Sequence, residues 1–161
     1  MLKNGCVLYD EQCRFIYKVS FLSLFSSLYA FYKGHYDLVL VPGGVFLTSV
    51  NYWKKPDYSW RRYVDMAYVK IAVTYQIYRA YNAENARLYY SILFFSVFCY
   101  EVGNYYYKKK MYWHSTYAHS MLHIIANLSN VVLYAGDIPA PANIKSYYNL
   151  NGSRNITNGD L

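Results

Sequence analysis

Five long stretches of mainly apolar or aromatic side chains, separated by short clusters of charge, limit what this chain can fold into. They lie at about 15–32, 37–53, 63–81, 87–106 and 111–135. Each is close to the roughly 20 residues that an α-helix needs to cross the hydrocarbon of a bilayer. The mean hydropathy is only -0.03, but the 23 tyrosines score as polar although their rings suit a membrane interface. The pattern predicts an all-α, polytopic transmembrane helix bundle of about five spans.

Polar interruptions leave a four-span alternative open. The third stretch contains Lys70, Gln76 and Arg79, and the first contains Lys18. The second contains the run 42–44, Pro-Gly-Gly, which should bend or loosen a helix. With five spans, we expect a cytosolic segment over 1–14, a transmembrane helical domain over 15–136 and a flexible polar tail over 137–161.

The basic residues predict an orientation in the membrane. Ten of the 16 Lys and Arg residues fall on one side if five spans alternate, and an excess of basic residues in short loops marks the cytosolic side. The N-terminus is therefore expected in the cytosol, and the C-terminal tail in the lumen of the endomembrane system or outside the plasma membrane. Two N-glycosylation acceptors, at Asn151 and Asn155, agree with that placement. The ten basic residues are Lys3, Arg14, Lys18, Lys54, Lys55, Arg61, Arg62, Lys108, Lys109 and Lys110.

The net charge of +7 indicates membrane lipids rather than nucleic acid as partners. Basic residues that flank spans set topology and contact anionic headgroups. No basic stripe is interleaved with residues that read bases, so we expect no nucleic-acid binding. The three cysteines, Cys6, Cys13 and Cys99, are odd in number and scattered, and give no disulfide framework.

A line of polar side chains follows one face of the last stretch. At helical spacing, Ser115, His119, His123, Asn127 and Asn130 lie close to that line. In hydrocarbon such a line must face the interior of the bundle, because unpaired polar groups are costly there. Two histidines one turn apart are the usual way in which a helix presents two imidazoles to one metal ion. The alternative is a pair of interhelical hydrogen bonds.

Other polar residues collect near the cytosolic ends of the expected spans. Ser49 lies near the end of the second stretch, Asp65 near the start of the third, and Glu101 near the end of the fourth. Each residue has an alternative reading. Asp65 could pair with Arg61 four residues before it, and Lys70 could extend to the membrane interface or pair with Asp65 or Glu101. Glu101 could be an interfacial charge, and Ser49 could hydrogen-bond to its own helix. The convergence predicts a buried polar site near the cytosolic face.

His119-Ser-Met-Leu-His123, together with Asp65 and Ser49, resembles the motifs of the membrane hydrolase superfamily that contains alkaline ceramidases and the adiponectin and progestin receptors. Those motifs are Ser-x-x-x-His at the end of one span, an Asp that opens the next, and His-x-x-x-His in the last span of a seven-span bundle. The resemblance implies that His119 and His123 bind zinc, and that Ser49 and Asp65 hold the activated water or its hydrogen bonds. Trp53 stands where the first motif has its metal-binding His.

The substitution at Trp53 bears directly on the expected activity, because an indole has no lone pair to offer zinc. Either His114, Glu101 or Asp65 supplies the third ligand, or the site is an inactive remnant. A live site would hydrolyse a lipid amide, with zinc lowering the pKa of water toward about 7. The alternatives are a non-enzymatic structural or assembly protein of the membrane, and a small transporter subunit. Five spans without internal repeats are few for a translocation path.

Overall fold

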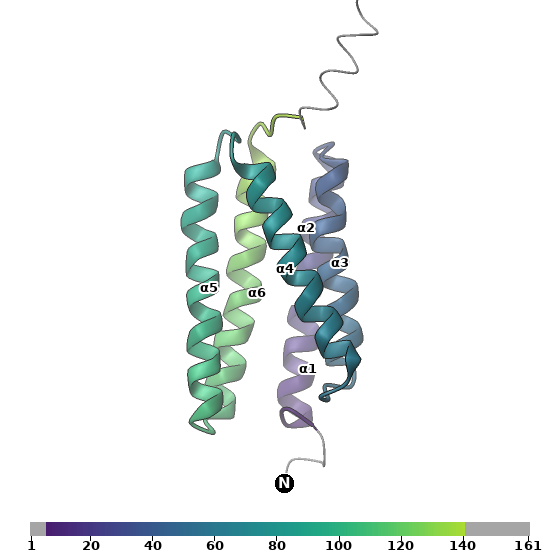
Figure 1. Ribbon diagram of the computed structural model, residues 1–161, viewed down its shortest axis with the longest axis vertical. Coiled ribbons are helices and arrows are strands. Elements are labelled where there is room, and N and C mark those ends of the chain that lie inside the picture. Colours follow the sequence, from purple (N-terminus) through teal and green to yellow (C-terminus); the bar gives the residue numbers. More distant parts are fainter. Residues whose placement is uncertain (1–5, 141–161) are drawn as a thin grey trace, which may run out of the picture.

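The computed structural model describes residues 6–140, and they form an antiparallel bundle of helices without a β-sheet (Figure 1). The prediction of an all-helical fold is confirmed. The helices are α1 (Asp10–Val19), α2 (Leu22–Tyr32), α3 (Tyr36–Trp53), α4 (Trp60–Ala80), α5 (Ala86–Lys108) and α6 (Tyr112–Ala135).

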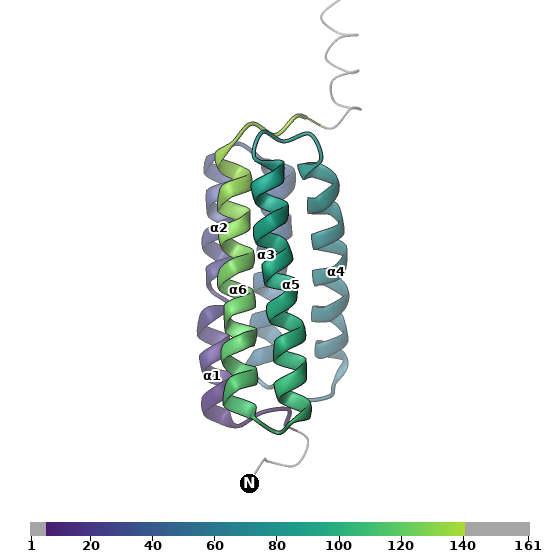
Figure 2. The same ribbon diagram turned by 90° about the vertical axis from the view of Figure 1, so that its left-hand side faces the viewer.

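Six helices make five rods, because α1 and α2 follow one another through a turn at Ser20 and Phe21. The rods alternate in direction (Figures 1 and 2). Each expected stretch corresponds to one rod, although the first begins at Asp10 rather than near residue 15, and the third at Trp60 rather than near residue 63. We call the end of the bundle that holds the α3–α4 and α5–α6 connections the basic end, since Lys54, Lys55, Arg61, Arg62, Lys108, Lys109 and Lys110 lie there.

Two tight turns explain why successive rods are antiparallel neighbours. Between α2 and α3, Gly34 adopts a left-handed conformation with φ of 78°, and the next amide, of His35, donates to the carbonyl of Ala30 at 3.0 Å. Glycine adopts this conformation at no steric cost. Between α5 and α6, Lys110 takes the same region with φ of 60°, at a cost of about 1 kcal/mol for a residue with a Cβ.

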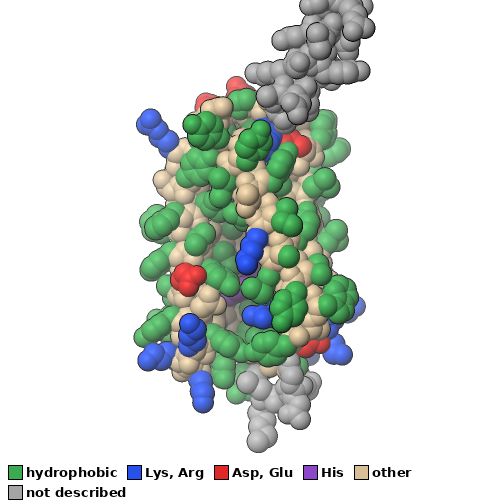
Figure 3. All heavy atoms as spheres, viewed as in Figure 1, with side chains coloured by type: hydrophobic (Ala, Val, Ile, Leu, Met, Phe, Trp, Pro, Cys, Tyr) green, Lys and Arg blue, Asp and Glu red, His purple; other side chains and the backbone are tan. Residues whose placement is uncertain are grey.

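The bundle exposes many large apolar side chains and buries small polar ones beside its apolar clusters. Leu40, Ile71 and Phe94 are 70, 69 and 70% exposed, whereas Ser129 and Ser49 are 0 and 2% exposed. Figure 3 shows hydrophobic side chains spread over the length of one face. Small residues at helix contacts with large apolar residues outside are typical of helices that pack in lipid.

Hydropathy alone identifies one helix in residues 6–140 as long and apolar enough to cross a membrane. It is the continuous rod Asp10–Tyr32, with a mean hydropathy of 1.2 over its best window. The first rod thus has the length and composition of a membrane span.

The proline in α3 does not end the helix, which continues through Pro42 to Trp53. Hydroxyl groups of neighbouring helices bind carbonyls in the turn before it. Ser27 Oγ donates to the carbonyl of Val39 at 2.8 Å, and Tyr68 OH donates to the carbonyl of Leu40 at 2.6 Å. Such side-chain hydrogen bonds are how helices tolerate proline inside a membrane.

The distal half of the polar line on α6 joins α6 to other helices. Asn127 Oδ1 accepts from Ser26 Oγ at 2.7 Å, and Asn127 Nδ2 donates to Ser23 Oγ at 3.2 Å. From α4, Gln76 Nε2 donates to Asn130 Oδ1 at 2.7 Å. This half of the line therefore connects α6 with α2 and α4.

The expected tail over 137–161 is described only as far as residue 140, and the two glycosylation acceptors lie outside the described residues. Residues 137–140 are held against the bundle. The amide of Asp137 donates to a carboxylate oxygen of Glu84 at 3.0 Å, and the carbonyl of Pro139 accepts from Arg79. Ile138 packs against the apolar cluster of this end.

Candidate functional site

A cavity of about 160 Å³ lies at the basic end of the bundle, between the N-terminal segment, α3, α4, α5 and α6. Its wall combines residues of the predicted site with polar groups of the neighbouring helices. The polar and aromatic members that matter for its chemistry are Trp53, Arg62, Asp65, Asn104, Tyr107 and His119.

The carboxylate of Asp65 is held by two hydroxyl groups of α3. Thr48 Oγ1 and Ser49 Oγ each donate to Asp65 Oδ1 at 2.8 Å. The structure therefore brings together Ser49 and Asp65, the two residues expected to orient water. Both hydroxyls bind the same oxygen, Oδ1. The other carboxylate oxygen of Asp65, Oδ2, forms no hydrogen bond to residues 6–140.

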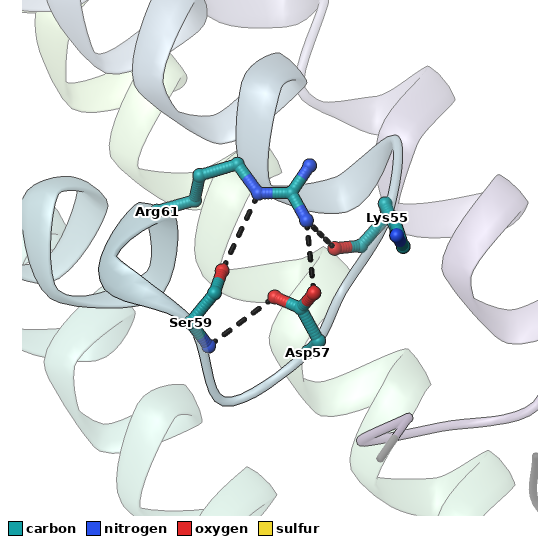
Figure 4. A network of polar contacts seen from close by, with 4 residues as sticks. All are labelled: Lys55, Asp57, Ser59 and Arg61. Carbon is teal, nitrogen blue, oxygen red and sulfur yellow. Dashed lines mark hydrogen bonds and ion pairs between the residues drawn. The ribbon is translucent and has the colours of Figure 1, made fainter. Parts of the chain in front are cut away.

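The alternative pair between Arg61 and Asp65 is not formed, because Arg61 turns into the α3–α4 connection (Figure 4). Its Nη2 lies 2.9 Å from Asp57 Oδ2 and donates to the carbonyl of Lys55 at 3.0 Å. Its Nε donates to Ser59 Oγ at 3.3 Å. Hydrogen bonding by Ser59, aided by the charge of Arg61, lowers the pKa of Asp57. The network shapes the connection whose Tyr58 lines the cavity.

The two predicted zinc ligands lie side by side inside the bundle. The rings of His119 and His123 have centroids 5.1 Å apart with an interplanar angle of 66°. His119 lines the cavity, and His123 is buried, with no hydrogen-bond partner for its Nε2. Within the described part of the chain, neither ring donates to or accepts from another helix. The alternative of interhelical hydrogen bonds is therefore not what the structure shows for this pair.

Trp53 lies beside His119. Its ring centroid is 5.3 Å from that of His119, in an edge-to-face arrangement. It is 4.9 Å from the ring centroid of Tyr52. Trp53 is part of the apolar cluster of this end. The indole fills space against an imidazole and adds no ligand.

The remaining predicted candidates do not join the histidines. His114 is exposed and lies against Tyr106, with ring centroids 5.2 Å apart. Lys70 and Glu101 are exposed too, and neither forms an ion pair within residues 6–140, so the expected pairs of Lys70 with Asp65 or Glu101 are absent there. No three His, Cys, Asp or Glu side chains of this part lie close enough to share a metal ion.

Sequence reasoning missed Arg62, which lines the cavity together with Asp65. Its guanidinium lies 5.4 Å from the centroid of the Tyr58 ring and forms no ion pair within residues 6–140. The hydroxyl of Tyr58 lies 3.1 Å from that of Tyr107. The available signal was the spacing, since Arg62 precedes Asp65 by three positions and shares its helix face. Its place in a basic cluster concealed that signal.

No family model matches the chain, and neither a curated protein nor a solved structure matches it. The donor set can therefore be judged only from its own chemistry. Two adjacent imidazoles without protein partners, one with a buried Nε2, fit two ligand positions of a zinc ion. They do not fit the three-ligand protein centre that the resemblance implies, because Trp53 supplies nothing.

Proposed function

We propose that this chain is a five-span integral membrane protein with its basic end in the cytosol. The distribution of side chains supports the proposal, since many large apolar groups are exposed and several serines are buried between the rods. The five rods are 18 to 24 residues long, which suits the thickness of a bilayer. The basic residues of both connections at one end favour that end as the cytosolic one.

We further propose that the cavity at the basic end hydrolyses a lipid amide, with zinc held by His119 and His123. The observation that carries this proposal is the pair of adjacent, unpartnered imidazoles, one of which faces the same cavity as Asp65. If the imidazole pair served only to join helices, its ring nitrogens would form hydrogen bonds to neighbouring helices. The side chains of Asn127 and Gln76 form such bonds.

The chain's own residues supply the proton chemistry. When bound, zinc polarises a carbonyl and lowers the pKa of water toward about 7. The unengaged oxygen of Asp65 accepts a proton from a water molecule in the cavity, while Thr48 and Ser49 fix the carboxylate through its other oxygen. The hydroxide so formed attacks the carbonyl carbon of the amide, and the C–N bond breaks as Asp65 returns the proton to the leaving amine nitrogen. Because the substrate is a lipid, it is expected to reach the cavity sideways from the bilayer, at the depth of the headgroups near the basic end.

A non-enzymatic membrane protein is the second candidate, and Trp53 favours it. Catalytic zinc sites normally have three protein ligands, and no such group exists within residues 6–140. In this reading the cavity is what remains of a hydrolase site. The polar line on α6 then acts only through contacts such as that of Asn127 with Ser26.

Zinc content tests the proposed site. We expect the protein, purified in detergent and dialysed against trace zinc, to hold near-stoichiometric zinc by mass spectrometry. His119→Ala and His123→Ala should each weaken zinc binding by at least about tenfold, because each removes one of two ligands. His114→Ala is the matched control, since this exposed histidine of the same helix should change nothing. Equal zinc content in all four proteins would contradict the site.

Restoring the third ligand separates the two candidates. Trp53→His places an imidazole beside His119, and Trp53→Phe is the control that keeps an aromatic ring there. If the wild type holds zinc and releases fatty acid from a lipid amide, and Asp65→Asn abolishes that release, the proposed hydrolase function is supported. If the wild type holds none and only Trp53→His gains it, the site is a remnant and the non-enzymatic function remains.

A further inference from the structure

The outward face of α4 has the spacing of a helix-packing seam. Tyr63, Ala67, Lys70, Thr74 and Ile77 are all exposed, and they follow one another at alternating intervals of four and three residues. This is the spacing at which one helix packs along another. The small side chains Ala67 and Thr74 on either side of Lys70 allow a second helix to approach closely. Within residues 6–140, nothing covers this face.

Lys70 is the one cation on the outward seam of α4, and it is unpaired within the described residues. It lies ten residues after Trp60, where α4 begins at the basic end, which places its Cα about 15 Å along the helix. Its neighbour Ile71 is 69% exposed. An unpaired ammonium among apolar side chains at this depth is costly, and a partner of opposite charge removes much of that cost.

Glu101 on α5 carries the opposite charge to Lys70 and is also unpaired within the described residues. It is exposed, and the large side chains one turn on either side, Val97 and Tyr105, are exposed as well. It lies seven residues before Lys108, where α5 ends, which is about 10 Å along the helix from the basic end. The two unmatched charges thus lie at similar depths on different rods, and the lysine side chain is long enough to bridge the difference.

We propose that these charges meet across an interface between two copies of this chain. Lys70 of one copy pairs with Glu101 of the other, and the same pair forms a second time around a two-fold axis along the membrane normal. Such an axis keeps both copies in the same orientation and each residue at its own depth, and a two-fold interface satisfies both charges of both copies. This goes beyond the hydrolase activity and rests only on the proposed insertion in a membrane.

Complementation in trans tests the interface. Two differently labelled populations of the full-length protein are placed in vesicles of neutral phosphatidylcholine, and energy transfer is followed as lipid is added. Lys70→Glu alone and Glu101→Lys alone should each need about tenfold more protein per lipid for the same transfer, because like charges then face each other twice. A mixture of the Lys70→Glu and Glu101→Lys proteins should regain the wild-type transfer, since every pair across the interface is again opposite.

The controls keep failure of the interface distinct from failure of insertion or folding. Flotation of the vesicles with the protein reports insertion, and helical circular dichroism reports folding. Arg87→Glu changes an exposed charge at the other end of α5 and should leave transfer unaltered. Transfer that is unaffected by either single substitution, or not regained in the mixture, would overturn the proposal. So would wild-type transfer that requires anionic lipid, because the partner of Lys70 would then be a headgroup.

Discussion

Replacing Arg79 with alanine should lower the free energy of unfolding by about 3 kcal/mol, because it breaks a largely buried ion pair. Arg79 is 7% exposed. Its Nε binds Asp37 Oδ2, and its Nη1 donates to the carbonyl of Pro139. The same carboxylate oxygen of Asp37 accepts from Tyr75 OH at 2.9 Å. One guanidinium thus joins α3, α4 and the segment after α6. The side chain of Asp37 is 31% exposed, so water solvates part of its charge when Arg79 is removed, and this reduces the loss of stability.

The effect of Arg79→Ala is measured by chemical or thermal unfolding in mild detergent, followed by helical circular dichroism. Asp37→Ala and the double variant complete a double-mutant cycle, which we expect to return a coupling of at least about 1.5 kcal/mol. Arg87→Ala removes an exposed arginine at the same end of the bundle, and it should change stability by less than about 0.5 kcal/mol. Additive single effects would show that the ion pair contributes nothing of its own.

Replacing Gly44 with alanine should lower the free energy of unfolding by about 1 kcal/mol, because the ring of Tyr68 fills the space that an added Cβ would occupy and the helix preference for alanine offsets part of that cost. An added Cβ would meet the ring and hydroxyl of Tyr68, its nearest neighbours. The ring must then swing away and give up its hydrogen bond to the carbonyl of Leu40, now 2.6 Å long. The measurement is the unfolding midpoint in the same detergent, with α3–α4 proximity followed by a cysteine crosslink.

Gly103→Ala is the matched control for Gly44→Ala. Gly103 is also a helical glycine at a helix contact, but a Cβ there would meet nothing closer than 3.6 Å. Since alanine favours a helix over glycine by about 1 kcal/mol, Gly103→Ala should leave stability unchanged or raise it. In a Tyr68→Ala background, Gly44→Ala should lose most of its cost. An undiminished cost there would mean that Tyr68 is not the obstacle.

The elements of the fold were predictable because their signals are local. The lengths of the apolar stretches and the short charged connections between them predict five antiparallel rods, and five rods are present in residues 6–140. The start of the first rod was the least accurate boundary. Asp10 and Glu11 look like loop residues in an apolar count, but they are acidic residues in the first turn of α1, where the helix dipole favours negative charge.

The candidate site was predictable in part. Two histidines four residues apart must share a helix face, so their adjacency followed from the sequence. The convergence of Ser49 and Asp65 at one depth followed from the order of the apolar stretches, and their roles came from the resemblance. The alternative pair of Asp65 with Arg61 is not formed. Arg61 and Arg62 are identical in type and adjacent, and only the course of the α3–α4 connection directs Arg61 to Asp57 and Arg62 to the cavity.

What the sequence by itself determined is therefore the set of rods, their alternating directions and the residues that share each face, because these follow from helix periodicity and loop length. The tertiary structure alone decided which faces meet. It left both histidines without partners, gave Asp65 two hydroxyl donors, set Trp53 against His119, and left Lys70 and Glu101 unpaired within the described residues. The physical reason is that side-chain partners depend on the rotation and separation of whole helices, which many weak contacts fix together and no local pattern encodes.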